Sequence, residues 1–165
     1  MITASFLALF LLLGSAAIAQ TTSPPGAAVG IAIPAMELIN LPDLLLLECQ
    51  QKGIKKSSNR TKDHNDEPIT RLCYKHPDFT LWVIESGNPN LLIEAAKMTK
   101  DHPPLPKGLT FQWPKSRVLQ VFGKPSKSSQ NSIEYLDPES GYQRSVEIFF
   151  KNDRILKIVW SFEID

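Results

Sequence analysis

The alternation of apolar and polar residues is most regular at the end of the chain. Two alternating runs, residues 145–150 and 155–160, flank a polar turn at residues 151–154. Side chains alternate between the two faces of a strand, so the length of the turn decides which residues meet. A turn with an odd number of residues places the apolar side chains together, whereas an even one would set them beside charged residues. The odd turn is therefore predicted, and it gathers Val146, Ile148, Phe150, Leu156, Ile158 and Trp160 on one face.

Other segments are typical of short helices and strands. Residues 42–52 and 114–122 are predicted helices, because a proline opens each of them and a glycine follows each. Residues 69–74, 79–85 and 132–136 are rich in β-branched and aromatic side chains and are predicted strands. The segment between the first helix and the first strand, residues 54–68, is polar and is interpreted as a loop.

Residues 88–100 allow two interpretations. Asn88 before Pro89, followed by helix-forming residues, is typical of a helix start, whereas the layout of the rest of the chain favours a strand. Helix is slightly preferred.

The beginning of the chain has the pattern of an export signal. Residues 2–13 form an apolar core, and Ala17-Ile18-Ala19 is a small-x-small cleavage site. Residues 1–19 are therefore predicted to be a signal peptide, with an uncleaved anchor as the alternative. Residues 20–35 are rich in Pro, Gly, Ser and Ala and are predicted to be a flexible tether. The expected location is periplasmic or secreted, with no stable membrane span after leader removal.

Export would place the two cysteines of the chain in an oxidising environment. In an oxidising compartment an even number of cysteines is usually paired, which predicts a Cys49–Cys73 disulfide. The alternative is a pair of reduced, buried thiols.

The two halves of the chain have similar layouts. Each contains a helix that ends at a glycine, then a Ser-rich loop and strands, and a proline-rich linker at residues 102–106 separates them. We therefore expect an α+β fold in which short helices pack on antiparallel sheet, as two tandem helix-plus-three-strand units. Residues 36–101 would form the first unit and residues 107–165 the second.

Part of the second half resembles a known family. The run from Gly108 through Pro114 to the helix ending Gly123-Lys124-Pro125, with a Tyr-containing strand and a final hairpin after it, resembles SmpA/OmlA (BamE)-like envelope modules. Two such units in tandem resemble the β-lactamase-inhibitor-protein arrangement. The resemblance implies a helical part on a three-stranded sheet, and binding of an enzyme through sheet and loops. The lipid-bearing cysteine typical of the assembly-factor members is absent.

Few residues suggest catalysis. The net charge of +1 provides no basic surface for nucleic acid. His64, with Asp66 or Glu67, is the only grouping that suggests a hydrolase, and a solvated loop is the simpler interpretation. His76 and His102 each precede a proline, and turn roles explain both. No catalytic residue, metal or cofactor is predicted.

The hairpin face opposite the apolar one has the composition of a binding patch. Aromatic and arginine side chains dominate binding hot spots, which selects Tyr142, Arg144 and Phe149, with Trp82 as their counterpart in the first half. The predicted function is that of an exported, non-catalytic protein-binding module. Most concretely, it is an inhibitor or immunity-type protein that binds an envelope or secreted enzyme. The alternatives are a structural or assembly factor of the cell envelope and, less favoured, a hydrolase that uses the His64 loop.

Overall fold

The structure is a computed structural model that describes residues 33–62, 65–85, 91–103, 105–137 and 143–163. The predicted signal peptide, most of the tether, His64 and Tyr142 lie outside these residues. The elements in chain order are α1 (Ile33–Ile39), α2 (Leu41–Gln51), β1 (Lys56–Lys62), β2 (Pro68–Lys75), β3 (Phe79–Glu85), β4 (Leu91–Met98), the 3₁₀ turn η1 (Pro106–Gly108), α3 (Lys115–Phe122), β5 (Lys127–Ser128), β6 (Ser132–Asp137), β7 (Arg144–Lys151) and β8 (Arg154–Phe162).

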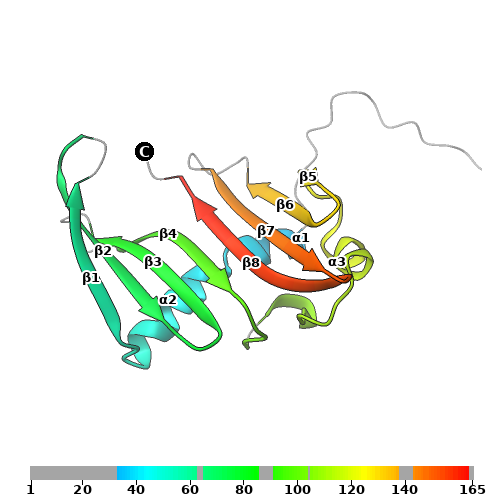
Figure 1. The fold of residues 1–165 in the computed structure, drawn as a ribbon, viewed down its shortest axis with the longest axis horizontal. Helices are drawn as coiled ribbons and strands as arrows, with labels where there is room; N and C mark the ends of the chain where they lie inside the picture. Colours follow the sequence, from blue (N-terminus) through cyan, green and yellow to red (C-terminus); the bar gives the residue numbers. More distant parts are fainter. Residues whose placement is uncertain (1–32, 63–64, 86–90, 104, 138–142, 164–165) are drawn as a thin grey trace, which may run out of the picture.

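All eight of these strands belong to one antiparallel sheet. Their order is β1-β2-β3-β4-β8-β7-β6-β5, so each half of the chain is a four-stranded meander and the two meanders join where β4 pairs with β8 (Figure 1). One cluster of buried side chains runs under both halves. The two halves therefore share one sheet and one core.

This architecture corrects the predicted fold class. The expected α+β fold, with short helices packed on two separate three-stranded units, is wrong. The part of the chain that the structure describes forms mostly a single antiparallel eight-stranded sheet, with only short helices. One strand missing from the prediction in the first half is β1, because residues 56–62 form the edge of the sheet rather than a loop. A helix that was not predicted, α1, begins at Ile33 within the predicted tether, and the predicted first helix corresponds to α2.

The ambiguous segment at residues 88–100 contains a strand. Leu91–Met98 is β4, so the slight preference for a helix was wrong. The segment is rich in helix-forming residues, but it lies between β3 and β8 and pairs with both. Pairing on two sides satisfies the hydrogen bonds of its backbone and overrides the preference of its residues for a helix.

The terminal hairpin has the predicted faces, with one local difference. Ile148 pairs with Ile158 and Val146 with Trp160, so the predicted shared face of these four residues is confirmed. The predicted odd number of turn residues is wrong, because the turn has two residues, Asn152 and Asp153, both with positive φ, as in the tight turns that suit twisted hairpins. The register shifts next to this turn, and Leu156 is consequently exposed while Ile155 is buried.

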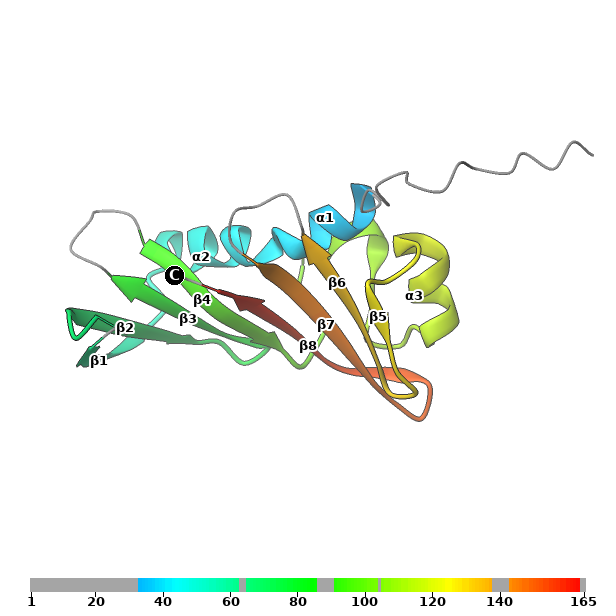
Figure 2. The ribbon, with the colours of Figure 1, turned by 90° about the horizontal axis from the view of Figure 1, so that it is seen from above.

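The helices lie on one face of the sheet. Figure 2 shows α1 and α2 one after the other along that face, and the contacts agree: α1 reaches β6 and β7, and α2 reaches β3 and β4. On α2 three buried residues, Leu41, Leu45 and Cys49, are spaced four apart, as expected of one helix face, and Pro42 next to Leu41 is buried as well. The same helix leaves Leu44 and Leu47 exposed on its outer side.

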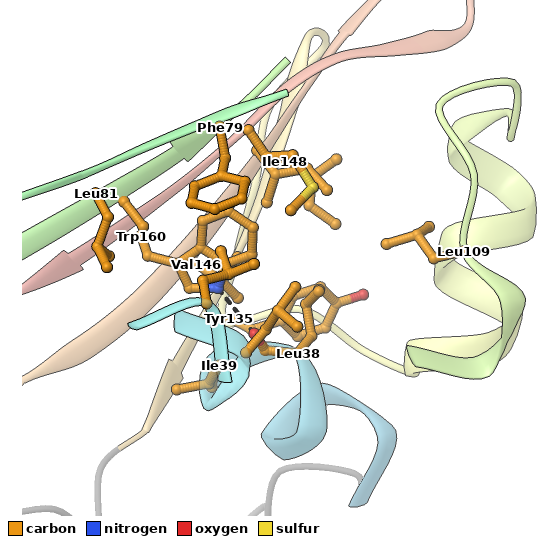
Figure 3. Packing of buried hydrophobic residues seen from close by; sticks show 14 of the residues in the cluster. Leu38, Ile39, Phe79, Leu81, Leu109, Tyr135, Val146, Ile148 and Trp160 are labelled. Carbon is orange, nitrogen blue, oxygen red and sulfur yellow. Dashed lines mark hydrogen bonds between the residues drawn. The ribbon is translucent and has the colours of Figure 1, made fainter. Parts of the chain in front are cut away.

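Trp160 lies at the centre of this covered face. Its side chain is fully buried, and its indole N–H donates a 2.8 Å hydrogen bond to the backbone oxygen of Leu38 in α1 (Figure 3). A buried indole needs such a partner, so the contact fixes α1 against β8. Val146 and Tyr135 continue the row of buried side chains on β7 and β6.

No helix within the described ranges is long and apolar enough to cross a membrane.

Candidate functional site

The face of the sheet opposite the helices is the first candidate site, and we call it the open face. No described helix covers it (Figure 2). Strand register defines a row across its middle: Ser57, Cys73, Trp82, Ala95, Ser161, Ser145 and Leu136. A second row lies beside it: Lys75, Thr80, Lys97, Val159, Glu147, Glu134 and Lys127. In contrast to the covered face, every residue in both rows is half-buried or exposed.

The predicted anchors are divided between the two faces. Trp82 and Phe149 lie on the open face, and both are half-buried. Phe149 pairs with Lys157, whose ammonium lies 4.0 Å from the centre of the phenyl ring. Arg144, however, has the parity of the buried residue Val146 and points toward the helices. Of the predicted anchors that the structure describes, only Trp82 and Phe149 therefore lie together on the open face.

Arg144 makes its contacts on the helix side. Its guanidinium donates a 3.2 Å hydrogen bond to Asn40 Oδ1 and lies 3.9 Å from an Asp43 carboxylate oxygen. It also lines a shallow hollow beside α1 and α2. The expectation that Arg144 and Phe149 act on one surface is wrong, because an even and an odd position on one strand face opposite ways.

Charges of both signs lie on the open face. Lys75 and Lys97 lie in the half formed by the first meander, whereas the second half carries Glu134 and Glu147 together with Lys127 and Lys157. Ala95, Ser145 and Ser161 separate the two halves with small side chains. Acidic groups of a partner would therefore be attracted mainly to the first half of this surface.

The predicted Cys49–Cys73 disulfide is not formed, and both cysteines are free thiols. Cys49 belongs to the core cluster, together with Leu72 and Tyr74, which flank Cys73 along β2. Because side chains alternate along a strand, Cys73 points to the open face while Cys49 lies under the covered one. The sheet therefore separates the two sulfur atoms. Burial raises the pKa of Cys49 to about 11.

The second candidate site is a polar cluster at the end of the first meander, which we call the histidine cluster. Its centre is His102, which is buried and hydrogen-bonds through both ring nitrogens. Nε2 lies 2.8 Å from Glu48 Oε2 on α2, and Nδ1 lies 3.2 Å from Asp78 Oδ2 in the β2–β3 turn. His76 completes the cluster, with its Nδ1 3.6 Å from the same Asp78 oxygen.

Aromatic packing and charge hold this cluster in place. The ring of Phe79 stacks on His76, with centroids 4.8 Å apart, and meets His102 edge-on at 4.9 Å. A hydrogen bond from the Lys52 ammonium and the contact with His102 lower the pKa of Glu48 from its ordinary value, although burial acts in the opposite direction. Glu48 is therefore a carboxylate at neutral pH.

Sequence reasoning missed the histidine cluster. His76 and His102 were assigned turn roles, but the structure places them 5.0 Å apart, measured between ring centroids. One ligand atom each from His76, Asp78 and His102 lie within 4.8 Å of one another, a grouping that could hold a metal ion. Asp78 and His102 are 24 residues apart, and His102 and Glu48 are 54 apart. Only the pairing of β3 with β4, which returns the chain to the β2–β3 turn, brings them together.

Comparisons of the chain with protein-family models, with curated protein sequences and with solved structures find no match.

Proposed function

We propose that this chain is a non-catalytic protein-binding module that recognises its partner through the open face of the sheet. The observation that carries the proposal is the state of that face: Trp82, Val159 and Phe149 remain half-exposed on a surface that no described helix covers. Apolar and aromatic side chains left uncovered at the centre of a surface and ringed by charges are typical of protein interfaces.

The chemistry of the face suggests what the partner presents. Acidic groups would lie over Lys75 and Lys97, and basic groups over Glu147, with apolar side chains against Trp82 and Phe149. The proposal includes the inhibitor or immunity-type role and an exported enzyme or envelope protein as the partner. Support for that part comes from the export pattern of residues 1–19 and from the resemblance of residues 108–162 to envelope modules.

The proposal is tested by affinity capture with substituted chains. We expect wild-type protein to recover one partner in stoichiometric amount, and the double variant Trp82→Ala plus Phe149→Ala to weaken that binding. Removal of a hot-spot residue costs at least about 2 kcal/mol, which corresponds to a roughly 30-fold loss of affinity. Affinity would be measured by titration once the partner is purified.

The matched control is Leu47→Ala, which truncates an exposed apolar residue on the helix side. It should leave the affinity unchanged. Equal affinity of the wild type and the double variant, or a larger loss with Leu47→Ala, would contradict binding through the open face.

A further inference from the structure

We propose that the histidine cluster is a binding site for a divalent transition-metal ion of the zinc type, with His102 Nδ1, Asp78 Oδ2 and His76 Nδ1 as ligands. This inference concerns the covered side and the turns of the first meander, so it is independent of partner binding on the open face. Two imidazoles and one carboxylate are a ligand set that zinc uses, with water in the remaining position.

The spacing of the ligand atoms suits such an ion. Zinc bonds of roughly 2.1 Å in tetrahedral geometry place neighbouring ligand atoms about 3.4 Å apart. The two separations from Asp78 Oδ2, 3.2 Å to His102 Nδ1 and 3.6 Å to His76 Nδ1, lie on either side of that value. One ligand atom from each of the three residues lies within 4.8 Å of the other two, so binding requires only a small closing movement.

The surroundings leave the two nitrogens available. The Asp78 backbone N–H donates to His76 Nδ1 over 3.3 Å, which is longer than a usual N–H hydrogen bond, so the lone pair of that nitrogen is only weakly engaged. Between His102 Nδ1 and Asp78, the metal ion takes the place of a shared proton. The face of Phe79 against His76 restricts the orientation of that ring before any ion binds.

Glu48 supplies the outer partner that metal-binding histidines generally have. It accepts a 2.8 Å hydrogen bond from Nε2 of His102, the nitrogen that faces away from the proposed ion. A carboxylate in this position fixes the tautomer and the orientation of the ligand ring. Lys52, at 2.6 Å, anchors Glu48 in turn. The bound ion would thus connect α2, the β2–β3 turn and the segment that follows β4.

The test is metal binding to the full chain after removal of metal with a chelator. Titration with Zn²⁺ should give one ion per chain, and Co²⁺ should give the strong visible absorption of a tetrahedral site. Asp78→Asn and His76→Gln should abolish both signals at concentrations that saturate the wild type. Glu48→Gln should weaken Zn²⁺ binding by about 10- to 100-fold, as expected for loss of an outer partner.

The third histidine of the chain provides the control. His64→Gln removes the same kind of side chain from a position with several acidic neighbours in the sequence and should bind Zn²⁺ with unchanged affinity. Circular dichroism of each metal-free variant checks that it is folded, and Asp78→Asn keeps the shape of the side chain. The proposal is overturned if wild-type protein binds no Zn²⁺. It is also overturned if folded Asp78→Asn and His76→Gln bind Zn²⁺ as tightly as the wild type does, or if His64→Gln abolishes binding.

Discussion

Trp160 and Ser161 are neighbours in the chain, yet they belong to two different surfaces. Trp160 continues a buried row with Val146 and Tyr135 under the helices, whereas Ser161 continues an exposed row with Ser145 on the open face. At these positions one row carries large apolar side chains and the other carries serines. A shift of one residue in β8 would exchange them, so strand register is the feature that separates stability from binding in this protein.

The difference also shows how the sheet can keep an open face. Burial of large side chains on the covered face, together with the Trp160–Leu38 hydrogen bond, supplies the packing of the six strands that contribute to the core, β2, β3, β4, β6, β7 and β8. The open face therefore need not contribute much to folding, and its residues are free to serve recognition. Substitutions on the two faces should have different consequences.

The largest effect is expected at Trp160. Trp160→Ala should lower the free energy of unfolding by about 3–5 kcal/mol, because it leaves a cavity and an unpaired backbone oxygen at Leu38. Ser161→Ala, one residue away on the open face, should change it by less than about 0.5 kcal/mol. Urea denaturation measures both. Similar costs at the two positions would mean that the faces do not differ as described.

The two thiols should differ strongly in reactivity. Cys49 is buried, and its pKa of about 11 keeps it protonated at neutral pH, whereas Cys73 lies half-buried on the open face. We expect an alkylating reagent to modify Cys73 in the folded protein and Cys49 only when the core opens. Mass spectrometry of the alkylated, unreduced protein gives the order of modification. Failure of both cysteines to react even in denaturant would instead indicate the disulfide.

Tyr135 should make stability depend on pH in the alkaline range. Burial raises its pKa from 10.0 to about 12, so the folded state holds the phenol proton more tightly than the unfolded state does. Its stabilising effect is present below pH 10 and is lost as the pH rises toward about 12. Its hydroxyl also donates to the Gly123 oxygen over 3.2 Å, so Tyr135→Phe should cost about 0.5–1.5 kcal/mol at neutral pH.

The measurement for Tyr135 is the difference in unfolding free energy between wild type and Tyr135→Phe as a function of pH. This difference should shrink above pH 10, because only the wild type loses stability as Tyr135 ionises. Tyr74 has a raised pKa as well, but it is present in both proteins and its effect cancels. A difference that stays constant across this range would show that Tyr135 is not buried.

The smallest effect is expected for the ion pair of the open face. The Arg71 guanidinium lies 2.8 Å from a carboxylate oxygen of Glu94, and both side chains are substantially exposed. Exposed pairs contribute about 0–1 kcal/mol, and salt screens them. Glu94→Gln should therefore lower the unfolding free energy by less than about 1 kcal/mol, with a smaller change at high salt. A larger, salt-insensitive change would mean that this part of the face is covered.

Local patterns predicted many of the individual helices and strands, although not the single sheet that they form. The two longer helices begin and end near the predicted residues because proline and glycine act within one turn of the chain. The hairpin faces followed from alternation except next to the turn, where Leu156 is exposed and Ile155 is buried. β1 was missed because an edge strand pairs on one side only, and a run of polar residues such as 56–62 can therefore form one. β4 was uncertain because its pairing partners, not its composition, determine its structure.

The candidate sites were predicted less completely, for two different reasons. The opposite directions of Cys49 and Cys73 follow from the sequence once Leu72 and Tyr74 are taken as core residues, and the same alternation separates Arg144 from Phe149. The histidine cluster could not be predicted in this way. Its members come from a helix, a turn and a linker, and only the complete meander brings them into contact.

The most direct test of binding through the open face compares cross-linking from the two sides of the sheet. A photoreactive residue would be placed at Val159 on the open face or at Leu47 on α2, which is 49% exposed. We predict that one partner cross-links from Val159 and not from Leu47, and that Trp82→Ala abolishes the product. Cross-linking of the partner from Leu47 alone, or in equal yield from both positions, would contradict this account.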